Sequence, residues 1–226
     1  MRWGLVGLGV GVGIVVLMTV GARPAQASTP NVGGDGARVD VRELARDAGL
    51  PEVWGDFFAL VAHGESRNNP HAVNDSPTEA RRSAEAFASA ANRFERCGHP
   101  PEAYSWGSGG LFGHIPTTAF AQLREGRCLS PEMILDPRVS LAAAVGFARG
   151  LMKWKRYAVD PTFHNLRAMW KWPAKGGDPD FLAERRPKYD RHAAVVGLPP
   201  SFLDQTPPPL PMTGDEVLDR LGVAVP

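Results

Sequence analysis

The chain has 226 residues, with 25 basic and 24 acidic side chains that give a net charge of +1. This length is sufficient for one well-filled domain with additional segments. A charge balance this close to neutral argues against nucleic-acid binding and against a strongly basic membrane-binding patch. The spacing of histidine and cysteine resembles no metal site, so no metal ion is expected.

Residues 1–27 have the layout of a secretory signal peptide. Arg2 is the only charge before an apolar run over residues 3–22, and the small residues of AQA at 25–27 form an expected cleavage site. The alternative is an uncleaved membrane anchor, because residues 3–22 are numerous enough to span a bilayer. Both interpretations predict that the rest of the chain is exported to the periplasm, the cell envelope or the medium.

The chain has two cysteines, Cys97 and Cys128. In an oxidising compartment they are expected to form a single disulfide. The alternative is two buried free thiols.

The rest of the chain predicts a mostly α protein. Residues 28–39 are polar and glycine-rich and predict a linker, followed by a domain over residues 40–200. Helical spacing and capping residues predict helices over 41–48, 51–66, 76–97 and 117–125, and further helices after Asp136, Asp160 and Asp178. Pro187 is expected to break the last helix, and Trp154 to lie on the inner stripe of the helix after Asp136. No alternating pattern typical of a strand is present.

Residues 201–226 form a proline-rich C-terminal extension. The segment TPPPLP at 206–211 predicts an extended, polyproline-like conformation, and residues 215–221 predict one short amphipathic helical turn. The extension is expected either to wrap the domain or to bind a partner.

Glu65 is the main candidate for chemistry, because it lies on an apolar helix face. If residues 51–66 form a helix at about 100° per residue, Trp54, Phe58 and Val61 lie within roughly 40° of Glu65. The carboxyl group then points toward the core. Removal of a carboxyl group from water raises its pKa, which suits a proton donor working near neutral pH.

A structural role for Glu65 is the alternative. Glutamate at a helix end commonly caps the helix, pairs with an arginine or extends to solvent, and Arg67 is close along the chain.

Three blocks of the sequence resemble the lytic transglycosylases, the lysozyme-like enzymes that cut peptidoglycan. ALVAHGESRNNPHAVN at 59–74 resembles their Glu-Ser helix end, and SWGSGGLFGHIPTTAF at 105–120 resembles their Gly-Leu-Met-Gln loop with the Pro-Ser-Thr-Ala that follows. LDPRVSLAAAVGFARGLMKW at 135–154 resembles the next helix of the family. The blocks occur in the family's order, and the resemblance extends over about residues 50–175.

The resemblance implies a lysozyme-like helical domain that binds peptidoglycan glycan strands and needs no cofactor. Glu65 would protonate the glycosidic oxygen between N-acetylmuramic acid and N-acetylglucosamine, then deprotonate the C6 hydroxyl of the muramic residue to give a 1,6-anhydro sugar. In the family's reaction the N-acetyl group of the substrate sugar assists the bond cleavage, so a second carboxylate is not required. Ser66 would contact the sugar or stabilise the helix end.

The resemblance also implies a substrate-binding loop, from which this chain departs. Gly110, Leu111 and Phe112 would pass close to the glycan, with Phe112 at the family's Met position. Gly113 occupies the position of the family's Gln, which His114 would replace. The family's Ala-Tyr-Asn block is replaced by AMW at 168–170, so the expected aromatic contact is Trp170 or Trp172, with a core tryptophan as the alternative.

An insertion separates the first two blocks, since Glu65 and Gly110 are 45 residues apart. The insertion is the predicted helix over 76–97, which would wall the cleft, contact a partner or add stability. Asp75, Glu79 and Glu85 lie within or beside it, and one of them would be the second carboxylate of an inverting hydrolase.

Two alternatives to a lytic transglycosylase therefore remain. One is a peptidoglycan or chitin hydrolase on the same fold. The other is a catalytically inactive glycan-binding or scaffold protein, with an unidentified partner in an envelope machine or a virion.

Overall fold

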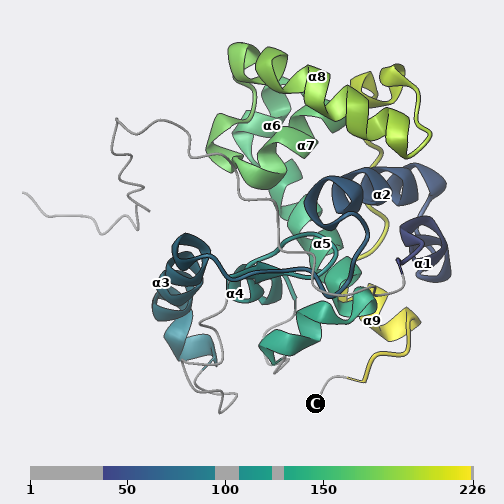
Figure 1. Cartoon of the computed structure of the whole chain (residues 1–226). Coiled ribbons are helices and arrows are strands. Elements are labelled where there is room, and N and C mark those ends of the chain that lie inside the picture. Colours follow the sequence, from purple (N-terminus) through teal and green to yellow (C-terminus); the bar gives the residue numbers. More distant parts are fainter. Residues whose placement is uncertain (1–37, 95–106, 124–129, 225–226) are drawn as a thin grey trace, which may run out of the picture.

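The computed structural model describes residues 38–94, 107–123 and 130–224, and it is mostly α-helical (Figure 1). The predicted leader over residues 1–27 and most of the predicted linker lie outside the described residues, as do Cys97 and Cys128. No described helix is both long and apolar enough to cross a membrane.

The first two helices form the layer that carries Glu65. Helix α1 (Val41–Asp47) is capped by Asp40, whose carboxylate accepts hydrogen bonds from the first backbone N–H groups. Helix α2 (Glu52–Ser66) is buried on all sides over residues 57–62, and it ends at Arg67 in the left-handed conformation. Both helices form where the sequence predicts them.

A small two-stranded sheet and two further helices follow α2. Strand β1 (Val73–Asn74) pairs antiparallel with β2 (Ser108–Gly109), a pair too short to appear as an alternating pattern. Between them, α3 (Pro77–Phe94) occupies the predicted insertion and lies at one edge of the molecule, beside α4 (Pro116–Phe120) (Figure 1). Helix α4 is shorter than predicted.

Helix α5 (Pro137–Met152) is the central element (Figure 1). The 3-10 turn η3 (Pro131–Leu135) precedes it, and Asp136 caps it as predicted. The helix ends before Trp154, which is 48% exposed, so the prediction that Trp154 lies on the inner stripe is wrong. The segment after α4 packs closely against α5 at Gly146. A Cβ atom at this position would lie 2.7 Å from the Gln122 carbonyl oxygen.

The helices α6 (Lys155–Val159), α7 (Phe163–Lys171) and α8 (Pro179–Val195) cover one end of α5 and α2 (Figure 1). The cap of α7 is Thr162 rather than Asp160. Helix α8 continues through Pro187, so the predicted break is wrong. Pro187 faces solvent, and it removes one backbone N–H donor from the helix. The helix tolerates this loss because its other side packs against α7, α2 and the later turn η5 (Pro200–Asp204).

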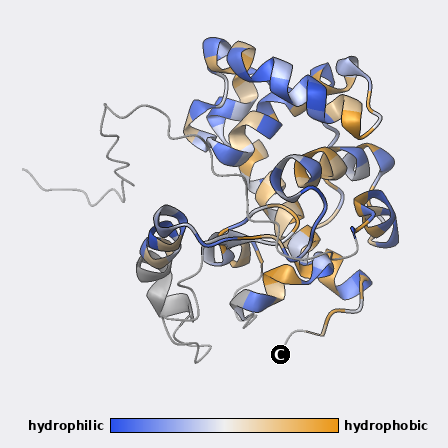
Figure 2. Ribbon diagram, viewed as in Figure 1, coloured by the Kyte–Doolittle hydropathy of each residue, from blue (hydrophilic) through white to orange (hydrophobic). Residues whose placement is uncertain are grey.

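The C-terminal extension belongs to the same packed core. After η4 (Pro173–Lys175) and η5 (Pro200–Asp204), α9 (Gly214–Arg220) packs against α5. Trp54 Nε1 donates a hydrogen bond to the Pro208 carbonyl at 3.2 Å, and Arg149 donates to the carbonyl oxygens of Leu210 and Met212. Figure 2 shows hydrophobic residues along α5 and α9, while α8 presents a largely hydrophilic surface. The extension therefore wraps the domain.

Because Leu218 on α9 is fully buried, Leu218→Ala should destabilise the whole protein by about 2–5 kcal/mol. Urea unfolding followed by circular dichroism would measure this loss, and the exposed Val195→Ala should change stability by no more than about 0.5 kcal/mol. A separate early transition for α9 in the variant would contradict a single cooperative core.

Candidate functional site

The glycine-rich loop after β2 lies directly against Glu65. A Cβ atom at Gly113 would lie 3.4 Å from both Cβ and Oε2 of Glu65, which is van der Waals contact distance. Gly113 has a φ of +61° and Gly110 a φ of +73°, values that favour glycine. The structure thus brings together two segments that the sequence separates by 45 residues.

Backbone and hydroxyl hydrogen bonds fix this loop. Gly109 and His114 exchange backbone hydrogen bonds at 2.9 and 3.1 Å, which closes the turn. The Ser66 hydroxyl lies 2.8 Å from the Leu111 carbonyl oxygen and 3.1 Å from that of Ala62, and is buried. Ser66 therefore ties the end of α2 to the loop, and this role accounts for its hydroxyl without a ligand.

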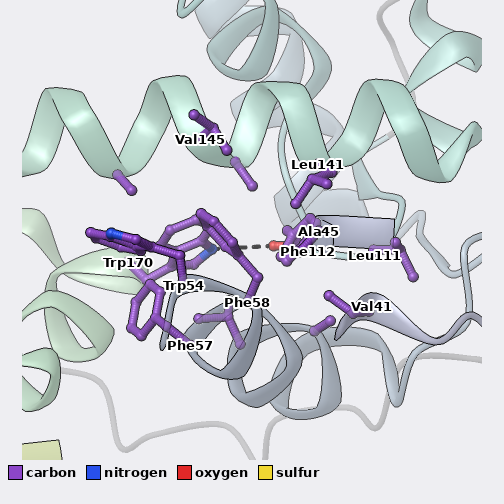
Figure 3. Packing of buried hydrophobic residues seen from close by; sticks show 14 of the residues in the cluster. Val41, Ala45, Trp54, Phe57, Phe58, Leu111, Phe112, Leu141, Val145 and Trp170 are labelled. Atoms are coloured by element: carbon purple, nitrogen blue, oxygen red, sulfur yellow. Dashed lines mark hydrogen bonds between the residues drawn. The ribbon is translucent and has the colours of Figure 1, made fainter. Parts of the chain in front are cut away.

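The apolar side chains of the loop lie in the core (Figure 3). Leu111 and Phe112 are at most 1% exposed, and Phe112 packs edge-on against Phe58. Trp170 is 6% exposed and donates a hydrogen bond from Nε1 to the Phe112 carbonyl at 3.4 Å. These side chains support the loop from beneath and offer no open ring face to a sugar.

His114 is also buried, among aromatic rings. Its ring centre lies 5.3 Å from those of Phe147 and Trp170, and its Nε2 has no hydrogen-bond partner in the described part of the chain. Burial lowers the pKa of His114 to about 4, while the Glu65 carboxylate acts in the opposite direction. His114 is therefore neutral at pH 7 and lies beneath the site.

The partner of Glu65 is Arg167 from the middle of α7. Arg167 Nη2 donates to Glu65 Oε1 at 2.7 Å, and Lys171 Nζ lies 4.0 Å from Oε2. The Glu65 side chain is 13% exposed and Arg167 only 2%. The pair is thus largely removed from water, and one carboxylate oxygen is anchored while the other faces the loop. Arg67, the partner that the sequence suggests, is exposed.

This environment reverses the expected direction of the Glu65 pKa shift. Burial by itself raises the pKa of the carboxyl group, but the charges of Arg167 and Lys171 outweigh burial and lower the pKa below its ordinary value. The expectation of a raised pKa is therefore wrong for the free protein, because the sequence gives no sign of a buried arginine facing the acid.

The Arg167 side chain lies between Gly64 of α2 and Tyr189 of α8. A Cβ atom at Gly64 would lie 2.7 Å from Arg167 Nη2 and from His192 Nδ1, so glycine is required there. The guanidinium lies 5.0 Å from the ring centre of Tyr189. Sequence reasoning missed these residues, although Arg167 follows Phe163 by four positions and precedes Trp170 by three, which places it on the buried stripe.

The candidate second carboxylates have other partners or positions. Glu79 pairs with Arg82 at 2.7 Å and Glu85 with Arg81 at 3.7 Å, all on α3. Asp75 lies between β1 and α3, and the main charges acting on the Glu65 pKa are all cationic. No described residue is thereby identified as a second acid.

The described residues hold no metal-ligand cluster, since they contain no group of three His, Cys, Asp or Glu side chains able to hold a metal ion. Neither of two surface hollows is lined by Glu65. One is bordered by residues of α1, α2 and the end of α8, and the other by residues around η3 and the start of α5.

The chain matches no protein-family model, and no curated protein or solved structure matches it. The site is therefore interpreted from its own geometry.

Replacement of Arg167 by methionine, which keeps an unbranched chain, should raise the pKa of Glu65 relative to the wild type, because only Lys171 and Lys188 then oppose the effect of burial. At pH 7 the variant should lose about 3–5 kcal/mol of stability, since it leaves a buried charge unpaired. NMR titration of the glutamate side chains would measure the pKa, with Arg67→Met as the matched control.

The pH dependence of stability gives a second readout for Arg167. In the wild type the lowered pKa of Glu65 stabilises the fold above the pKa of an unfolded glutamate, and this contribution is lost as pH falls through the folded value. In Arg167→Met the pKa of Glu65 is less depressed, so this residue should cause a smaller loss of stability on acidification than it does in the wild type. An unchanged Glu65 pKa in this variant would contradict the assigned ion pair.

His114 should make the protein less stable in mild acid. With a pKa of about 4 in the fold and 6.5 when unfolded, His114 binds protons mainly in the unfolded state between these values. Stability should therefore fall by about 2 kcal/mol between pH 7 and pH 5 through this residue alone. Urea unfolding at both pH values should show a smaller loss for His114→Gln, and equal losses would place His114 in water.

Proposed function

We propose that this protein is an exported, lysozyme-like lytic transglycosylase that cleaves the β-1,4 bond between N-acetylmuramic acid and N-acetylglucosamine in peptidoglycan. The observation that carries the proposal is the position of Glu65, at the end of α2, with one oxygen held by Arg167 and the other beside Gly113. The three sequence blocks fall, in order, on the end of α2 with Glu65, on the glycine-rich loop with α4, and on α5.

The chemistry requires one carboxyl group that acts twice. Protonated Glu65 would deliver its proton to the glycosidic oxygen as the C1–O bond breaks, which releases the neighbouring sugar as an alcohol. The resulting carboxylate would take the proton of the C6 hydroxyl while O6 bonds to C1, which closes the 1,6-anhydro ring. No water is consumed, and Glu65 ends in the protonated state in which it began.

The contacts of Glu65 assign separate roles to its two oxygens. Oε1 accepts the hydrogen bond from Arg167, whereas Oε2 lies next to Gly113, where the missing side chain leaves room for a reacting group. Arg167 is then a positioning residue that also stabilises the carboxylate formed after proton delivery. The same interaction makes the protonated form scarce in the free protein.

A non-catalytic glycan-binding protein is the second candidate, and one observation favours it. The 2.7 Å contact between Glu65 and the buried Arg167 satisfies the carboxylate without a substrate. If Glu65 serves only to join α2 to α7, the domain would bind glycan strands and leave them intact.

Digestion of purified sacculi by the mature domain, with mass spectrometry of the released muropeptides, tests the proposal. The wild type should release products with 1,6-anhydro ends, which are lighter by one water than hydrolysis products. Glu65→Gln should release essentially none, because an amide cannot donate the required proton. Arg67→Gln, a neutral amide replacement two residues away, should remain active.

The outcomes separate the candidates. Products that carry an added water would indicate a hydrolase, and binding without release by the wild type would indicate a non-catalytic protein. Equal turnover by Glu65→Gln would remove Glu65 from the mechanism. Circular dichroism of both variants confirms that any loss is not caused by unfolding.

A further inference from the structure

Three basic side chains near Glu65 lower its pKa: Arg167 and Lys171 on α7, and Lys188 on α8. A fourth, Arg185, lies near Lys188. Arg167 and Lys171 are four residues apart on α7, and Arg185 and Lys188 are three apart on α8, so each pair shares one helix face. Arg167 Nη2 lies 2.7 Å from the Glu65 carboxylate, and Lys171 Nζ lies 4.0 Å from it. The pKa of Lys188 is lowered first by burial, and then by the nearby charges of Arg167 and Lys171.

The positive charge of this cluster exceeds the negative charge available to it. Glu65 is shared by Arg167 and Lys171, and among the described carboxylates Arg185 pairs only with the exposed Glu184, at 3.3 Å. In the described part of the chain, no carboxylate lies within ion-pair distance of Lys188. Cations this close together repel one another, and an added anion would relieve the repulsion.

A second observation also points to an incoming acceptor. Arg167 is 2% exposed, and its Nε and Nη1 atoms have no hydrogen-bond partner in the part of the chain that the structure describes. Buried guanidinium donors without partners are costly, because they have lost their water. Because both atoms are buried, an acceptor that enters beside Glu65 would reach them only after the side chains that cover them move.

Trp172 gives the cluster a flat apolar side. Arg185 Cζ lies 4.6 Å from the centre of the Trp172 ring and Lys171 Nζ lies 5.8 Å from it. The Lys171 side chain is 57% exposed, so its ammonium group is accessible to a ligand. A sugar that carries a carboxylate matches this combination of aromatic surface and positive charge.

We propose that Lys171, Arg185 and Lys188 form a subsite for a carboxylate group of the glycan strand, next to Glu65. The inference rests on the proposed function, which supplies the glycan. Peptidoglycan carries carboxylates on the lactyl groups of its muramic residues and on its peptide stems, whereas chitin carries none. A carboxylate bound here offsets the cations that lower the pKa of Glu65, so the acid is protonated more often once substrate is in place.

The test is the binding of three soluble glycans to a Lys171→Gln/Lys188→Gln double variant, measured by calorimetry. The glycans are peptidoglycan strands with peptide stems, strands stripped of peptides so that the lactyl carboxylates are free, and neutral chitooligosaccharides. The matched control is Arg46→Gln, which removes one exposed positive charge from α1. Both lysines are at the surface, so the double variant should fold normally.

The double variant should bind carboxylate-bearing strands about tenfold more weakly than the wild type, with a smaller salt dependence. Its affinity for chitooligosaccharides and the affinities of Arg46→Gln should be unchanged. A loss confined to peptide-bearing strands would identify the stems as the source of the carboxylate. A loss with stripped strands would identify the lactyl group.

Two results would overturn the subsite. If the double variant binds carboxylate-bearing strands as tightly as an active wild type does, the subsite is wrong while the proposed function stands. If the wild type binds none of the glycans and releases nothing from sacculi, the subsite fails together with the function on which it rests.

Discussion

The ion pair between Glu65 and Arg167 is the contact on which the rest of the site depends. It joins α2 to α7 across 102 residues of sequence, and both side chains are largely withdrawn from water. Removing two charges from water costs several kcal/mol each, and apolar residues of similar size often fill such a place with no loss of stability. Stability alone is therefore a weak explanation for the pair.

The neighbours of the pair are arranged to admit the arginine. Gly64 leaves the space that the guanidinium and His192 occupy, and Tyr189 packs over the guanidinium at 5.0 Å. On the other side of Glu65, Gly113 brings the loop backbone to the carboxylate. Gly113 lets the loop backbone lie against the Glu65 carboxylate, and Gly64 leaves room for Arg167 to pair with it. The aromatic core fixes this arrangement, because Phe112 and Trp170 are buried and a hydrogen bond joins Trp170 to the Phe112 carbonyl.

The sequence predicted those elements whose signals are local. Asp136 and Asp178, each followed by proline, cap helices that begin where predicted, and helical spacing placed Glu65 on the buried side of α2. The same local rule failed at Pro187, because contacts of α8 with α7 and η5 maintain a helix that proline alone would interrupt. Resemblance, rather than periodicity, suggested that the loop at 109–114 would meet Glu65.

Arg167 was missed because it carries a charge. A charged residue on a helix is normally assigned to the solvent side, yet the positions of Phe163 and Trp170 place Arg167 between buried neighbours. Its partner is on another helix, so no pattern within α7 could reveal it. The pKa of Glu65 depends on this distant contact, which is why the predicted direction of its shift was wrong.

The two candidate functions require opposite behaviour from the same carboxyl group. A purely structural Glu65 works best when it stays ionised, and every cation near it serves that end. A catalytic Glu65 must hold a proton at the moment of bond cleavage, so some of the positive charge around it has to be offset by the substrate. Lys171 and Lys188 add positive charge near a carboxylate that Arg167 already neutralises. That surplus has no purpose in a simple helix–helix ion pair, and it is the feature that favours a site for an anionic ligand.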